Sequence, residues 1–213
     1  MNINKPDGII FDVDGTIWDS TGSVEGLWNK AIRENSHIDV RVSREQLKQL
    51  FGKTMEEIGD ILFPMLPCEE RRKLEHACHT SENEGLRQHP GIVYEDMKRV
   101  MARLSKKYSL YVVSNCQSGY IEMMSEVTGI DEYICDFTCF GDTGKGKAYN
   151  IDYIAKKHGL SHPVYIGDTE GDADACKEAG VPFIYAAYGF GQVPQEKACA
   201  TIYKPAELLE IFD

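Results

Sequence analysis

The amino-acid sequence predicts an α/β protein in which a parallel sheet is covered by helices on both faces. After residue 90, short apolar segments alternate with longer segments whose apolar residues recur at helical spacing. This repeated strand–helix pattern is typical of a parallel sheet. A block with helical periodicity, residues 18–87, interrupts the first strand–helix unit. We therefore expect an α/β core domain made of residues 1–17 and 88–213, and an inserted helical domain made of residues 18–87.

The first element is predicted to be a buried strand that carries charge at its carboxyl end. Its apolar run Gly8–Phe11 stops abruptly, and the polar segment Asp12–Thr16 follows. A short apolar run bounded in this way is typical of a strand that is buried on both faces of a sheet.

The inserted block is predicted to be helical throughout. Apolar residues recur on one helix face between residues 24 and 32. The segments Ser43–Gln46 and Thr54–Glu57 both have the pattern of a capping box, which marks a helix start. A charged helix is then expected from Cys68 to Glu84, and Gly85 is expected to end it.

The rest of the chain is predicted to complete the sheet. We expect strands at residues 110–113, 134–140, 164–166 and 183–187, and helices over residues 97–104, 121–127, 151–158 and 173–179, with a short last helix near 208–209. Glycines at 129, 159 and 180 are expected to end three of these helices. Ligands of such sheets bind beyond the carboxyl ends of the strands, so the inserted block is expected to cover the site as a lid.

Composition and charge restrict the classes of partner. Apolar residues make up 42% of the chain and charged residues 27%, as in ordinary globular proteins. The net charge of −11 disfavours binding to nucleic acid polymers and to anionic membranes. No apolar run reaches the roughly 18–20 residues that span a bilayer, and residues 1–7 lack the pattern of a signal peptide. We expect a cytoplasmic protein that is a monomer or a weak homodimer.

Asp12 and Asp14 form the first candidate motif. Side chains two residues apart on a strand share a face, so these two carboxyl groups are expected to lie close together. Two close carboxyl groups differ in proton affinity, which suits one to act as an ionised nucleophile and the other as a general acid and base. Gly15 permits a sharp turn after them. The motif alone is also compatible with a capped turn.

A second acidic motif follows a later strand. Asp168 is expected at the tip of that strand and Asp172 near the start of the next helix. Oxygen ligands from Asp12 and Asp168 suit Mg²⁺. The alternative interpretation is an acidic helix N-terminus that interacts with the helix dipole.

Two weaker signals complete the pattern. Ser114 and Asn115 end the strand of residues 110–113, where a hydroxyl and backbone N–H groups can bind a phosphate, although a helix cap explains them equally. Lys145 and Lys147 lie just before a helix, and either lysine can neutralise the charge of phosphate and carboxylates. The four motifs follow one another along the chain, each at a strand end or a helix entrance.

These four motifs resemble those of the haloacid dehalogenase superfamily of hydrolases, in particular its phosphoglycolate phosphatase-like group. The first motif is matched by Asp12–Thr16, the second by Ser114, the third by a lysine and the fourth by Gly167–Asp168 with Asp172. The resemblance covers essentially the whole chain. It implies a Rossmann-like, doubly wound core with a helical cap of the C1 type inserted after the first motif.

The resemblance also implies a role for each residue. Asp12 would be the nucleophile, and Asp14 the general acid and base whose backbone carbonyl also binds the metal. Asp168 would complete the Mg²⁺ ligands, with Asp172 in support. Ser114, Asn115 and a lysine would bind the phosphoryl group.

Three lysines are candidate residues of the site. Relatives often carry a proline after the lysine of the third motif, and this chain does not. Lys147 is preferred to Lys145, because Lys147 is followed by Asn150 and Ile151 as in the lysine-bearing helix entrance of similar proteins. Lys53 lies in a loop where related enzymes have a specificity loop, so it is a candidate contact for an anionic part of the substrate, or an ordinary solvated turn lysine.

The resemblance implies a Mg²⁺-dependent phosphatase that hydrolyses a small phosphorylated metabolite through an aspartyl-phosphate. The substrate stays open among phosphoglycolate-like compounds and sugar or nucleotide monophosphates. One alternative is a phosphomutase similar to β-phosphoglucomutase, which shares every core motif. A second is a non-enzymatic, phospho-accepting signalling module, although such modules usually place the acceptor at a later strand and lack a large helical insertion.

Overall fold

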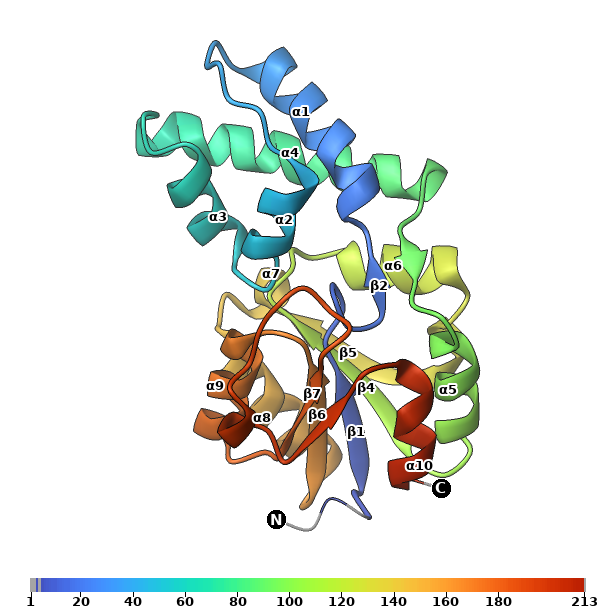
Figure 1. Ribbon diagram of the computed structural model, residues 1–213. Helices are drawn as coiled ribbons and strands as arrows, with labels where there is room; N and C mark the ends of the chain where they lie inside the picture. Colours follow the sequence, from blue (N-terminus) through green and yellow to red (C-terminus); the bar gives the residue numbers. More distant parts are fainter. Residues whose placement is uncertain (1–2, 4, 213) are drawn as a thin grey trace.

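The core of the protein is a six-stranded, fully parallel sheet with the strand order β5-β4-β1-β6-β7-β8 (Figure 1). The computed structural model describes residues 3 and 5–212. The strands are β1 (Gly8–Phe11), β4 (Ser109–Ser114), β5 (Ile134–Cys139), β6 (Pro163–Gly167), β7 (Phe183–Ala186) and β8 (Ala200–Ile202). The predicted doubly wound parallel sheet is confirmed.

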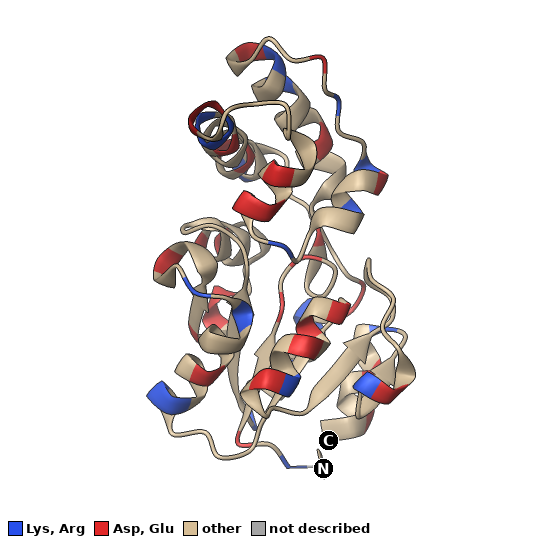
Figure 2. Cartoon of the chain, turned by 90° about the vertical axis from the view of Figure 1, so that its left-hand side faces the viewer, with Lys and Arg blue, Asp and Glu red and all other residues tan. Residues whose placement is uncertain are grey.

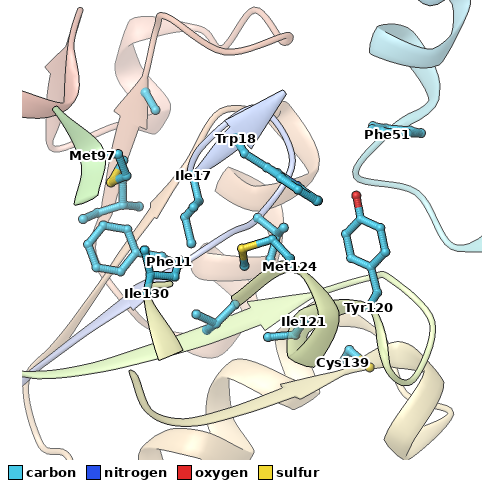
Figure 3. Close-up of a cluster of buried hydrophobic side chains, with 14 of the residues drawn as sticks. Phe11, Ile17, Trp18, Phe51, Met97, Tyr120, Ile121, Met124, Ile130 and Cys139 are labelled. Carbon is cyan, nitrogen blue, oxygen red and sulfur yellow. The ribbon is translucent and has the colours of Figure 1, made fainter. Parts of the chain in front are cut away.

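Helices cover both faces of this sheet. Alternating side chains of β1 pack into two separate clusters, one on each face. Ile9 and Phe11 belong to one buried cluster, which contains residues of α5 (Met97–Leu104), α6 (Tyr120–Thr128) and α10 (Leu208–Phe212). Ile10 belongs to the cluster on the other face, which contains residues of α8 (Lys147–His158) and α9 (Glu170–Ala179). Figure 3 shows part of the first cluster, in which Phe11 lies near Met97 and Ile130. The short helix α7 (Phe140–Thr143) and three 3₁₀ turns, Asp131–Tyr133, Gln195–Lys197 and Pro205–Glu207, join these elements.

Four helices lie beyond the sheet, on the side where the strands end (Figure 1). They are α1 (Thr21–Asn35), α2 (Arg44–Leu50), α3 (Met55–Leu62) and α4 (Cys68–Gln88). Both predicted capping boxes are confirmed: Ser43 and Gln46 cap α2, and Thr54 and Glu57 cap α3.

The predicted end of α4 at Gly85 is wrong, because the helix continues to Gln88. A Cβ atom on Gly85 would collide with the Leu27 side chain of α1. Glycine at this position therefore permits close packing of α1 against α4 rather than helix termination. In contrast, Gly129, Gly159 and Gly180 end α6, α8 and α9 in the left-handed conformation, as predicted.

The chain passes between the sheet and the helical layer twice, and the two passages are paired. Strand β2 (Trp18–Asp19) leads toward α1, and β3 (Ile92–Val93) returns from α4; they pair antiparallel, with Trp18 opposite Val93. The sequence did not predict β2, β3 or β8, because runs of two or three residues show no periodicity.

Acidic and basic side chains are distributed over both layers, with the acidic ones in the majority (Figure 2). Among the helices formed by residues 3 and 5–212, none combines the length and the apolar character needed to cross a membrane.

Candidate active site

A buried lysine joins two of the predicted site carboxylates. Asp12 follows β1, and its backbone N–H donates to the carbonyl of Ile166 on β6, so both strands fix its position. Lys147, the first residue of α8, places its Nζ atom 2.8 Å from Asp12 Oδ1 and 2.5 Å from Asp172 Oδ1. Each of these three residues is at most 5% exposed. Lys145 is exposed at the surface, so the structure brings Lys147 rather than Lys145 to the carboxylates.

Asp172 is held by the start of its own helix. Thr169 caps α9: its hydroxyl accepts from the Asp172 backbone N–H, and the Asp172 Oδ2 atom accepts from the Thr169 backbone N–H at 2.9 Å and from its hydroxyl at 2.7 Å. This capping box orients Oδ1 toward Lys147.

Asp168 completes the carboxylate group at the tip of β6. The chain turns away from β1 at Gly15, where φ is +82° and a Cβ atom would collide with the Asp168 carboxylate. The Asp168 Oδ2 atom accepts from the backbone N–H of Phe190 at 2.7 Å, and Oδ1 accepts from the Thr16 hydroxyl at 3.3 Å. The turn and these donors bring the first and fourth motifs into contact.

This carboxylate group fits a divalent cation. Asp12, Asp168 and Asp172 each offer a carboxylate oxygen within 4.8 Å of the others, and all three are buried. When all three carboxyl groups are ionised, the single lysine balances only one of their negative charges. Hard oxygen donors of this kind suit Mg²⁺, which would compensate the remaining negative charge.

Burial dominates the electrostatics of these groups. It raises the pKa of Asp12 to about 6, although Lys147 lowers it and the negative charge of Asp172 raises it further. Burial together with Asp172 and Asp12 raises the pKa of Asp168 well above its usual value. Burial lowers the pKa of Lys147, but Asp12 and Asp172 outweigh it and raise that pKa overall, so the ammonium group stays charged.

Asp14 is positioned by a separate pair of hydroxyl groups. Its Oδ1 atom accepts from Ser20 Oγ at 2.7 Å and from the Tyr120 hydroxyl at 2.8 Å. In Figure 3 the Tyr120 ring rises from α6 with its hydroxyl toward the loop that carries Phe51. Burial raises the pKa of Asp14 to about 7, and the bonds from Ser20 and Tyr120 oppose that rise. Asp14 therefore exchanges a proton near neutral pH.

Ser114 and Asn115 lie at the end of β4, as predicted. Ser114 is buried, and its Oγ atom accepts from the Cys116 backbone N–H at 3.3 Å. The Asn115 side chain donates to the Gly52 carbonyl at 2.8 Å. Asn115 thus connects the sheet layer to the loop between α2 and α3. Ser114 and Asn115 line the same cavity as Asp12 and Asp14.

A cavity of about 50 Å³ connects the two layers. The sheet layer contributes Asp12, Asp14, Ser114, Asn115 and Tyr120. The helical layer contributes Trp28, Phe51, Lys53, His79 and Glu82 among others, and Lys53 itself is exposed.

Sequence reasoning missed several residues of this site. Tyr120 and Ser20 hold Asp14, yet each is an ordinary residue at the start of a helix with no motif around it. Thr169 holds Asp172, and its place inside the fourth motif, three residues before Asp172, was visible in the sequence. Glu82 looks like one more charged residue of a charged helix. Its position on the face shared with Leu74, Cys78 and Leu86 was the available signal, because all four are buried.

Solved structures share this fold over nearly the entire chain. A predicted phosphoglycolate phosphatase from Haemophilus somnus aligns with a TM-score of 0.84 at 21% identity, covering 96% of this chain and 97% of the other. A putative phosphoglycolate phosphatase from Lactobacillus plantarum aligns with a TM-score of 0.83 at 17% identity, covering 98% and 100%. CbbY from Rhodobacter sphaeroides, in complex with phosphate, aligns with a TM-score of 0.80 at 18% identity, covering 96% of each chain. The protein therefore shares its fold with these three proteins.

The sequence comparisons identify the family. The curated phosphoglycolate phosphatase of Rhodobacter capsulatus is 22% identical over 199 residues, which cover 87% of this chain and 86% of that protein. The model of the haloacid dehalogenase-like hydrolase family matches residues 9–186. The chain belongs to this family, as its motifs predicted.

Proposed function

We propose that the protein is a Mg²⁺-dependent phosphatase that hydrolyses a small phosphomonoester through a covalent phosphoryl intermediate on Asp12. Membership in the hydrolase family, together with its phosphatase relatives, indicates a phosphatase. One observation carries the mechanism: Asp12 is clamped by Lys147 and lies next to Asp168 and Asp172 in the wall of a cavity that also contains Asp14.

The reaction that these residues support has two steps. A carboxylate oxygen of Asp12 attacks the phosphorus atom, the bond from phosphorus to the ester oxygen breaks, and Asp14 donates its proton to the leaving oxygen. A water molecule then attacks the same phosphorus atom, loses a proton to Asp14 and displaces the Asp12 carboxylate, which releases phosphate. A pKa of about 7 suits Asp14 to both transfers at neutral pH.

The remaining residues bind the phosphoryl group and the metal. Asp12, Asp168 and the backbone carbonyl of Asp14 would hold Mg²⁺, with Asp172 in support; the ion supplies positive charge that stabilises the phosphoryl oxygens. Lys147 is placed to neutralise the same oxygens. Ser114 and the backbone of Asn115 would bind the phosphoryl group, and Lys53 stays a candidate for substrate specificity.

The same proposal includes the domain division and the compartment. Residues 18–87 would form a cap domain over a core of residues 1–17 and 88–213, which the layered arrangement in Figure 1 supports. All seven cysteines are free thiols, which is typical of a reducing compartment such as the cytoplasm.

Replacement of the nucleophile tests this function. Asp12→Asn should reduce phosphate release from an aryl phosphate by about 10⁴-fold or more, because a neutral amide is not a nucleophile here. After an acid quench, wild-type protein incubated with ³²P-labelled substrate should carry a hydroxylamine-sensitive label, and the variant should not. Asp152→Asn, a surface aspartate paired with Lys156, is the control and should behave as wild type. Full turnover by Asp12→Asn would refute the assignment.

A further inference from the structure

The cavity has two chemically different ends. At the sheet end lie the groups proposed to react with phosphate, Asp12 and Asp14. The opposite wall is built by the helical layer from Trp28, His79 and Glu82, with apolar side chains around them. A phosphomonoester bound with its phosphorus atom at Asp12 therefore directs its leaving group toward this wall.

Glu82 is the distinctive group of that wall. The side chain is only 5% exposed, and its Oε2 atom accepts from the Trp28 indole N–H at 3.0 Å. Among residues 3 and 5–212, Trp28 is the one donor to this carboxyl group, and Oε1 receives no hydrogen bond. Burial and the nearby charge of Asp14 raise the pKa of Glu82 to about 8, against the bond from Trp28. The Oε1 atom is not fully buried and faces the cavity, so it can accept a hydrogen bond from a ligand there.

No buried cation balances Glu82 within the described part of the cavity wall. His79 is half-buried, and its Nε2 atom lies 2.8 Å from Asn83 Nδ2. Burial and His76 lower the pKa of His79, so its ring is neutral at pH 7. Lys53 also lines the cavity, but its side chain is exposed to water, which weakens its attraction for an anion.

We propose that Glu82 selects substrates whose leaving group carries a hydroxyl or ammonium group and disfavours those whose leaving group carries a carboxylate. A donor on the leaving group would satisfy the unused oxygen of Glu82. Above pH 8, where Glu82 is ionised, a carboxylate in the same place would lie against a buried negative charge without a buried counter-charge. This inference rests on the proposed phosphatase activity and narrows its substrate class.

Four phosphate esters with two-carbon leaving groups test the selection. They are 2-hydroxyethyl phosphate, phosphoethanolamine, ethyl phosphate and 2-phosphoglycolate, which differ only in the terminal group. Wild-type protein with Mg²⁺ at pH 9, where Glu82 is ionised, should show kcat/KM values about tenfold or more above that of ethyl phosphate for the first two, and below it for 2-phosphoglycolate. A tenfold ratio is the discrimination that one hydrogen bond to a buried, charge-bearing group typically provides.

Four variants assign the discrimination to a residue. Glu82→Leu should bring the hydroxyethyl and aminoethyl esters down to the kcat/KM that the same variant shows for ethyl phosphate. Glu82→Gln should retain recognition of the hydroxyl ester and lose that of the ammonium ester. Glu75→Gln, a buried glutamate of the same helix outside the cavity lining, is the control and should retain the wild-type ranking. Lys53→Met tests the other candidate, the exposed lysine of the cavity lining.

The outcomes separate this inference from the proposed function. A wild-type preference for 2-phosphoglycolate over 2-hydroxyethyl phosphate would overturn the role of Glu82 and leave the phosphatase assignment intact. So would a ranking that changes in Lys53→Met and not in Glu82→Leu. Because the wild-type ranking needs no variant, a failure of Glu82→Leu to fold does not prevent the test. Absence of phosphate release from all four esters and from an aryl phosphate would overturn both proposals.

Discussion

Glu82→Gln should make the protein more stable at pH 8 and change its stability little at pH 4. Glutamine has nearly the same shape as glutamate, and its amide oxygen can accept the bond that the Trp28 indole N–H now donates to Glu82. The substitution therefore removes only the capacity to carry a negative charge inside the protein. Both proteins are compared in EDTA, because the charge of Asp14, a proposed metal ligand, contributes to the raised pKa of Glu82.

The magnitude follows from the shift in proton affinity. Burial raises the pKa of Glu82 from 4.5 to about 8. In the unfolded chain the group loses its proton near pH 4.5, whereas the folded protein retains the proton up to about pH 8, so the folded state loses stability over that interval as the pH rises. At 1.36 kcal/mol for each pKa unit the full loss is about 5 kcal/mol, which is an upper value because neighbouring groups relax. A gain of about 2 kcal/mol or more at pH 8 is expected for the variant.

Urea unfolding of both proteins between pH 4 and pH 9, followed by circular dichroism, measures this difference. Glu84→Gln is the matched control, because Glu84 is on the same helix but exposed. Its free energy of unfolding should follow that of the wild type at every pH. A difference between Glu82→Gln and wild type that does not grow from pH 4 to pH 8, or a variant less stable at pH 8, would refute the reasoning.

Three further substitutions test other parts of the structure. Lys147→Met should lower the free energy of unfolding by about 3–5 kcal/mol at pH 8 in EDTA, because it leaves two buried carboxylates without their cation; equal stability in urea would contradict this. Asp168→Asn should abolish most of the rise in melting temperature that millimolar Mg²⁺ gives the wild type, and an unchanged rise would exclude Asp168 as a ligand. Gly85→Ala should destabilise the protein by about 1–3 kcal/mol in thermal unfolding, despite better helix propensity, because its Cβ atom meets Leu27. A higher melting temperature would show that the two helices separate easily.

The parts of the fold that depend on local pattern were predictable from sequence. Strands such as β1 and β6 are continuous apolar runs followed by aspartates, and both the runs and the polar ends are visible in the sequence. Capping boxes at Ser43 and Thr54 are local as well, because the two bonded residues are three positions apart. The core carboxylates Asp12 and Asp168 could be placed together because carboxyl ends of parallel strands meet at one edge.

The parts that depend on contacts between distant segments were not predictable. Gly85 carries the same local signal whether it ends a helix or lets a neighbour approach, and only the position of Leu27 decides between the two. Glu82 acquires its character from Trp28, 54 residues away, which supplies its hydrogen bond. Tyr120 contacts Asp14 across 106 positions. Contacts between residues so far apart produce no periodic pattern in the sequence.

Pairing of β2 with β3 has a consequence for how this protein tolerates change. Because Asp19 lies opposite Ile92, everything between them starts and finishes at neighbouring points, about one strand spacing apart. A segment with adjoining ends can be shortened, lengthened or exchanged without pulling on the sheet. Chimeras that swap residues 20–91 for the corresponding segment of another member of the family should thus retain the folded sheet layer. A library of such segments on one unchanged sheet layer is a practical route to altered substrate preference.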